Sequence, residues 1–68
     1  MIEQKSKGEE VIGTYNPEGN RQVEDIKDSA RNLIDRVDDY CPDGRRKSLA
    51  ITNIETAAMY AVKSLFEG

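Results

Sequence analysis

The sequence predicts an all-α protein built on an antiparallel two-helix hairpin. Apolar residues recur at helical spacing over about residues 20–40 and again over about residues 44–66. Between them, the run Cys41-Pro42-Asp43-Gly44 stops the first helix, because proline lacks an amide hydrogen and Asp-Gly favours a turn. So short a connection forces the two helices to be antiparallel neighbours.

Length and composition limit the functions open to this chain. Its 68 residues form one small domain, which buries only roughly 60% of its unfolded surface and therefore gains from a covalent staple or a partner. Cys41 is the only cysteine and histidine is absent, so no disulfide and no zinc cluster are available. We expect no cofactor, no metal and no catalytic residue, and hence a protein that is not an enzyme.

The charge pattern also argues against two classes of partner. The net charge is −3 with both signs mixed, whereas proteins that bind duplex nucleic acid usually carry a basic excess. The nearly uncharged stretch in the last third is too short to span a bilayer, and residues 1–13 contain no apolar core of a signal peptide. We therefore expect a soluble cytoplasmic protein that binds neither membrane nor duplex nucleic acid.

Residues 1–13 are predicted to be a flexible N-terminal arm that precedes a hairpin domain over residues 14–68. Polar and charged residues dominate the first ten positions. Apolar residues gather over residues 11–15, and a short strand or an extended arm both fit them. Turn-forming residues follow over residues 16–20, where Asn20 is the expected N-cap of the first helix.

The first helix is predicted to be amphipathic. Its apolar stripe consists of Val23, Ile26, Ala30, Leu33, Ile34 and Val37. Its opposite face carries charged residues that we expect to lie in solvent: Lys27, Arg31, Asp35 and Asp38.

The second helix is apolar on more of its surface than one partner helix can cover. One stripe should meet the first helix and consists of Ile51, Ile54, Ala58, Ala61, Val62 and Leu65. A second apolar set lies off that stripe and consists of Leu49, Ala50, Ala57, Tyr60 and Phe66. We expect a second copy of the chain to cover the second set, which predicts an obligate homo-oligomer.

Three consecutive cations, Arg45, Arg46 and Lys47, open the second helix. A helix N-terminus favours anions, and cations are mildly destabilising there unless something compensates. They fit an anion site, a pairing with acidic residues of a neighbouring chain, or a solvated position.

Two further groups carry the same ambiguity. Tyr15 and Lys27 fit a base-stacking ring and a phosphate contact, or an anchor for the arm and a solvated side chain. Ser48, Thr52 and Glu55 share a helix face and fit ligand contacts, back-bonding to the preceding turn, or hydrogen bonds between helices. The acidic pairs Asp38-Asp39 and Glu9-Glu10 fit solvated surface.

Two stretches together resemble a known family. Residues 15–27 read Y-N-P-E-G-N-x-x-V-x-x-I-K, and residues 41–63 read C-P-D-G-R-R-K-S-L-A-I-T-N-I-E-T-A-A-M-Y-A-V-K. Both resemble the hairpin domain of the phage anti-CBASS and anti-Thoeris sponges, which sequester the nucleotide signals of bacterial immunity. The chain differs from the family pattern at Arg46, where an acid is common, at Tyr60, where tryptophan is common, and at Ile54, which replaces leucine.

The resemblance implies a homohexamer of hairpins that binds cyclic dinucleotides, and in some members cyclic trinucleotides, without cleaving them. It implies that Tyr15 stacks on a base and that Lys27 contacts a phosphate. The candidate ligand-binding residues are Tyr15, Asn16, Pro17, Lys27, Arg45, Arg46, Lys47, Ser48 and Thr52. Such a sponge would act in the cytoplasm of the infected bacterial host. The alternative is a small helical protein-interaction module with no nucleotide ligand.

Overall fold

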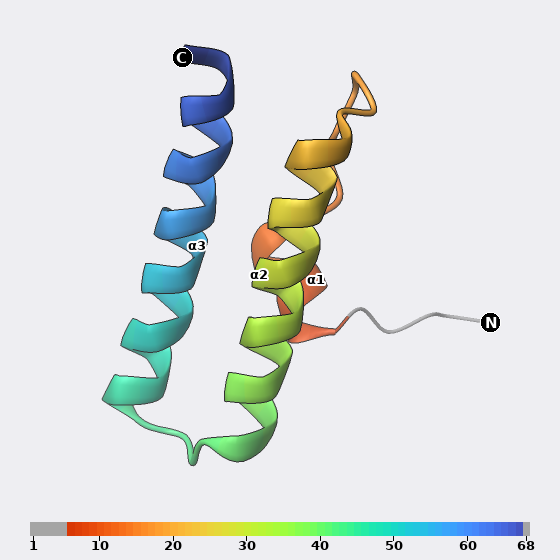
Figure 1. The fold of residues 1–68 in the computed structure, drawn as a ribbon. Helices are drawn as coiled ribbons and strands as arrows, with labels where there is room; N and C mark the ends of the chain where they lie inside the picture. Colours follow the sequence, from red (N-terminus) through yellow and green to blue (C-terminus); the bar gives the residue numbers. More distant parts are fainter. Residues whose placement is uncertain (1–5, 68) are drawn as a thin grey trace, which may run out of the picture.

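A computed structural model of the chain describes residues 6–67. Within these residues there are three helices and no strand: α1 (Lys7–Ile12), α2 (Arg21–Tyr40) and α3 (Arg45–Glu67). Helices α2 and α3 run antiparallel and form the hairpin, and α1 packs mainly on α2 (Figure 1). The all-α class and the hairpin that the periodicity predicts are confirmed in the described part of the chain.

The boundaries of α2 follow from local chemistry. The Asn20 side chain accepts hydrogen bonds from the amides of Gln22 and Val23, at 2.8 and 3.1 Å, so Asn20 is the N-cap that the sequence predicts. At the other end the Cys41 amide still donates to the Val37 carbonyl. The helix stops there because Pro42 cannot continue the hydrogen-bond pattern.

The core lies between the two long helices. Five apolar side chains are buried there: Val23, Ala30, Ile34, Ile51 and Ala58. All five belong to the two apolar stripes that the sequence predicts. Leu33 and Leu65, which also belong to those stripes, are exposed at the edges of the hairpin.

The N-terminal segment differs from the expected flexible arm or short strand. Residues 1–5 lie outside the described part, but Lys7–Ile12 forms helix α1. Ser6 starts it with a capping box, in which its hydroxyl accepts from the Glu9 amide and the Glu9 carboxylate accepts from the Ser6 amide. The expectation of a flexible arm is therefore wrong over α1, because a local cap and packing on α2 hold this short helix.

Helix α1 covers the face of α2 that the sequence analysis places in solvent. Arg31 is only 7% exposed, and its guanidinium donates to the Gly13 carbonyl just after α1. The Asp35 carboxylate accepts from the Gly8 amide at 2.6 Å, so α2 satisfies a free amide of the first turn of α1. These two residues attach α1 to the hairpin and are not solvated charges.

Candidate functional site

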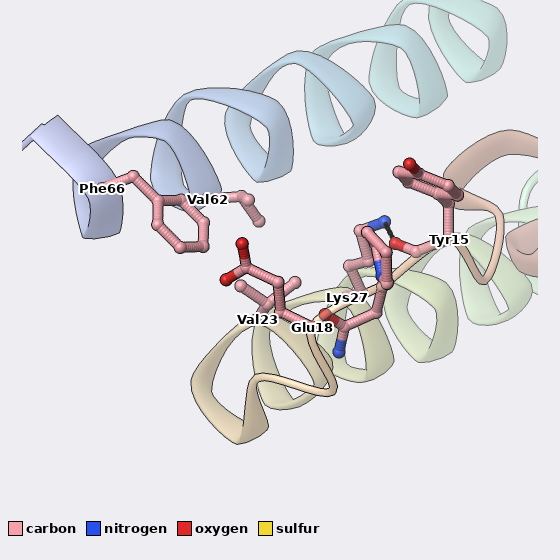
Figure 2. Close-up of a pocket in the computed structure, with 8 residues that line it drawn as sticks. Tyr15, Glu18, Val23, Lys27, Val62 and Phe66 are labelled. Carbon is pink, nitrogen blue, oxygen red and sulfur yellow. Dashed lines mark hydrogen bonds between the residues drawn. The ribbon is translucent and has the colours of Figure 1, made fainter.

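A pocket of about 320 Å³ opens where the start of α2 faces the end of α3. The loop between α1 and α2 supplies one side, the first turns of α2 supply the floor and α3 supplies the far wall (Figure 2). Its lining residues are Tyr15, Asn16, Pro17, Glu18, Val23, Lys27, Val62 and Phe66.

The loop that carries the pocket is held by its own hydrogen bonds. The Asn16 side chain accepts from the Asn20 amide at 3.2 Å and donates to the Asn20 carbonyl at 3.0 Å. The Gly19 amide donates to the Asn16 carbonyl at 3.1 Å, which closes a turn around Pro17. Asn16 thereby ties the loop to the N-cap of α2 and fixes where its neighbours lie.

Tyr15 and Lys27 meet in this pocket. The Lys27 ammonium donates a hydrogen bond to the Tyr15 backbone carbonyl, and Tyr15 is 79% exposed (Figure 2). An ammonium has three donors, and within residues 6–67 only one of those on Lys27 is used, so two face the pocket region without a partner there. The pair therefore presents an accessible aromatic face beside a positive charge.

Beneath the loop, Arg31 and Glu24 form a polar network. The buried Arg31 guanidinium bridges the Gly13 carbonyl and the Glu24 carboxylate, and the latter also accepts from the Asn16 side chain at 3.4 Å. The hydrogen bond from Arg31, and then the one from Asn16, lower the pKa of Glu24 below its ordinary value. Both ends of the segment 13–16 are thus fixed to α2.

The residues of the apolar wall of the pocket were not among the ligand-binding residues predicted from the sequence. Val62 and Phe66 come from the last turns of α3 and face Val23 across the hairpin. Phe66 was expected to belong to the assembly surface, yet it lines this pocket. The location of both residues could have been predicted from the sequence, because an antiparallel hairpin brings the end of α3 opposite the start of α2.

The remaining candidates lie at the other end of the hairpin (Figure 1). Arg45 and Arg46 are exposed. Lys47, Ser48 and Thr52 line another pocket, of about 320 Å³, between α1 and α3. The structure therefore brings together Tyr15, Asn16, Pro17 and Lys27 at one end, and separates them from Arg45, Arg46, Lys47, Ser48 and Thr52.

Lys47 is engaged within its own chain. Its ammonium contacts the Asp43 carboxylate at 2.9 Å, the Asp38 carbonyl at 3.0 Å and the Asp38 carboxylate at 3.3 Å. The hydrogen bond to Asp43, and then the one to Asp38, raise the pKa of Lys47, and the same contact lowers the pKa of Asp43. This cation closes the turn between α2 and α3.

The described residues hold neither a metal-binding cluster nor a membrane-spanning helix. Residues 6–67 contain no group of three or more cysteine, aspartate or glutamate side chains that could hold a metal ion. No helix in the same part of the chain is long and apolar enough to cross a membrane.

Fold and pocket together define a small helical-hairpin domain with a pocket lined in part by aromatic and cationic side chains. The family model for the "Acb2/Tad1, hairpin domain" matches residues 8–66, which is most of the chain. The protein therefore belongs to this family of anti-CBASS and anti-Thoeris sponges, as residues 15–27 and 41–63 predict. No curated protein and no solved structure matches it.

Two consequences follow from family membership. The match begins at Gly8, inside α1, and therefore includes the helix that the sequence analysis did not expect. Sponges of this family bind their ligands and do not cleave them, which agrees with the expected absence of enzymatic activity. The family thereby indicates a sponge-type role against host defence.

Proposed function

We propose that this protein is a phage sponge that sequesters cyclic oligonucleotide second messengers. The ligands would be cyclic dinucleotides such as 3',3'-cGAMP, with cyclic trinucleotides as a second class. A captured messenger no longer reaches its CBASS effector, so the protein would act by stoichiometry in the cytoplasm of the infected bacterial host.

The observation that carries this proposal is the pairing of Tyr15 and Lys27 in one pocket of a sponge-family chain. A base stacks on an aromatic ring with a gain of about 1–3 kcal/mol, and an ammonium makes a charge-assisted hydrogen bond to phosphate. Tyr15 would supply the stacking contact and Lys27 the phosphate contact. Asn16 and Pro17 would hold the loop against the ligand.

The proposal includes a homo-oligomer, which the family resemblance implies to be a hexamer. Leu49 and Tyr60 share the face of α3 that points away from α2, and both are exposed in the single chain, Tyr60 to 63%. Ile51 and Ala58 on the facing side are buried. A second copy of the chain would cover the exposed face. Arg45, Arg46, Ser48 and Thr52 would line a second kind of site formed where copies meet.

A direct test separates capture from cleavage. The protein is incubated with 3',3'-cGAMP, separated from unbound nucleotide, denatured and analysed by mass spectrometry. We expect intact cyclic nucleotide in an amount that matches the sites occupied. Recovery of linear product would contradict a sponge. A native mass spectrum of the undenatured complex reports the number of copies and of bound ligands.

The exposed face of α3 also fits the alternative function, a protein-interaction module without a nucleotide ligand. A thermal-shift screen against cyclic di- and trinucleotides separates the two. A ligand that binds only the folded chain stabilises it by about 2.7 kcal/mol at a hundredfold excess over Kd. The absence of any shift would favour the interaction module.

A further inference from the structure

One pocket residue has the wrong charge for an anionic ligand. Glu18 lines the same pocket as Tyr15 and Lys27, and Figure 2 shows its carboxylate directed toward Val62 and Phe66 of α3. The nearby Lys27 ammonium donates to the Tyr15 carbonyl, and no ion pair links it to Glu18 in the described part of the chain. The carboxylate therefore faces the pocket with its acceptors available.

A carboxylate in this position restricts what lies beside it. An ionised carboxylate only accepts hydrogen bonds, and it repels the phosphates of a cyclic dinucleotide. Phosphate must therefore lie toward Lys27, and neutral N–H or O–H donors must lie toward Glu18. In a nucleotide those donors are the amino and imino groups of a base or the hydroxyl of the ribose.

We propose that Glu18 determines base specificity by accepting hydrogen bonds from guanine, an inference that rests on the proposed function. Guanine presents two adjacent donors, its N1–H and its N2 amino group, and these match the two oxygens of one carboxylate. Adenine presents its N6 amino group next to the N1 acceptor, which the carboxylate repels. The pocket thus selects a cyclic dinucleotide that contains guanine over one that contains only adenine.

The placement of the other pocket residues agrees with this orientation. Tyr15 lies at one end of the pocket and Phe66 at the other, with the Glu18 carboxylate directed toward the Phe66 end (Figure 2). A base packed against Val62 and Phe66 would turn its hydrogen-bonding edge toward Glu18. Its phosphate would then lie on the side of Lys27.

The test uses calorimetric titration of the full chain with cyclic di-GMP, cyclic di-AMP and cyclic di-inosine monophosphate. The unaltered protein should bind cyclic di-GMP about tenfold or more tightly than cyclic di-AMP, the factor expected from one good base-edge contact. Cyclic di-inosine monophosphate, which lacks the N2 amino group, should fall between them.

The variant Glu18→Gln keeps the shape but replaces one acceptor by a donor. We expect it to bind cyclic di-GMP about tenfold more weakly and cyclic di-AMP at least as tightly as before, because a carboxamide matches the donor and acceptor of adenine. Glu10→Gln, an exposed glutamate of α1, is the matched control and should leave all three affinities unchanged.

Three results would overturn the inference. One is equal affinity of the unaltered protein for all three ligands. The second is equal weakening of cyclic di-GMP and cyclic di-AMP by Glu18→Gln, which indicates a ribose contact. The third is unchanged binding of cyclic di-GMP by the variant. Failure of the proposed function itself has a different result: the folded, unaltered protein then binds no cyclic dinucleotide at all.

Discussion

Gly8 of α1 lies directly against the backbone of Arg31 in α2. A Cβ atom placed on Gly8 would lie 2.2 Å from the Arg31 carbonyl oxygen, well inside van der Waals contact. Only a residue without a side chain permits this approach. The contact explains how a helix of six residues packs closely enough for the Asp35 carboxylate to reach its first turn.

The variant Gly8→Ala tests this contact by the sign of its effect. In an exposed helix the change would stabilise the protein by about 1 kcal/mol, because alanine is the better helix former. Here the added methyl group meets backbone that cannot move aside, so we expect a loss of about 1–3 kcal/mol, as for other overpacked contacts. Urea unfolding at one fixed protein concentration measures the difference, and a gain in stability would show that α1 does not dock as described.

The prediction from sequence succeeded where local patterns decide the structure. The apolar periodicity located α2 and α3, and the turn chemistry located the Asn20 cap. It failed for α1, whose six residues hold only two apolar ones and which depends on Arg31 and Asp35 far along the chain. The Ser6-x-x-Glu9 capping box was the one local signal that could have indicated this helix.

The candidate site was predictable only where its residues are close together in the sequence. Tyr15 and Lys27 flank the start of α2, and their pairing follows once the loop turns back. Val62 and Phe66 join them only through the antiparallel packing of α3. The sequence analysis considered acidic partners for Lys47 only in a neighbouring chain. In the structure Lys47 pairs with Asp38 and Asp43 of its own chain.

The turn between α2 and α3 should make stability depend on pH at both extremes. The hydrogen bond from Lys47 lowers the pKa of Asp43 below 3.8, so its contribution is present above that pH and is lost as the pH falls through the folded value. The pKa of Lys47 is raised above 10.5, chiefly by Asp43 and then by Asp38, so its contribution is present below 10.5 and is lost as the pH rises further. The contribution of this pair to the melting temperature should therefore be constant between about pH 5 and pH 10, where both groups stay charged.

The variants Asp43→Asn and Lys47→Met separate this pair from the other charges. Each should weaken the fall in melting temperature on acidification. The double variant should add little to Lys47→Met, which already removes the contact with Asp43, whereas relative to Asp43→Asn it also loses the contacts with Asp38. Some acid dependence should persist, since Arg31 and Asn16 also lower the pKa of Glu24. Full additivity of the two variants would contradict the pairing.

The exposed face of α3 should couple assembly to ligand capture. Tyr60 is 63% exposed in the single chain, and large aromatic residues at interface centres often cost about 2 kcal/mol or more when truncated. We expect Tyr60→Ala to dissociate the oligomer in sedimentation at micromolar concentration and to weaken the binding of 3',3'-cGAMP. Tyr40→Ala removes a similarly exposed ring at the end of α2 and should do neither. A monomeric variant with undiminished affinity would separate capture from assembly.

The contact between Lys27 and the Tyr15 carbonyl makes the two residues energetically dependent on each other. Tyr15→Phe keeps the ring and should leave the affinity for 3',3'-cGAMP nearly unchanged, whereas Tyr15→Ala removes stacking and should cost about 1–3 kcal/mol. Lys27→Met loses the charge-assisted bond to phosphate and also releases the backbone that positions Tyr15. The double variant Tyr15→Ala with Lys27→Met should therefore lose less affinity than the sum of the two single losses, because the positioning effect of Lys27 has no ring left to act on. Calorimetric titration of the four proteins at two salt concentrations measures this double-mutant cycle. Strict additivity of the losses in binding free energy would show that Lys27 does not position the ring.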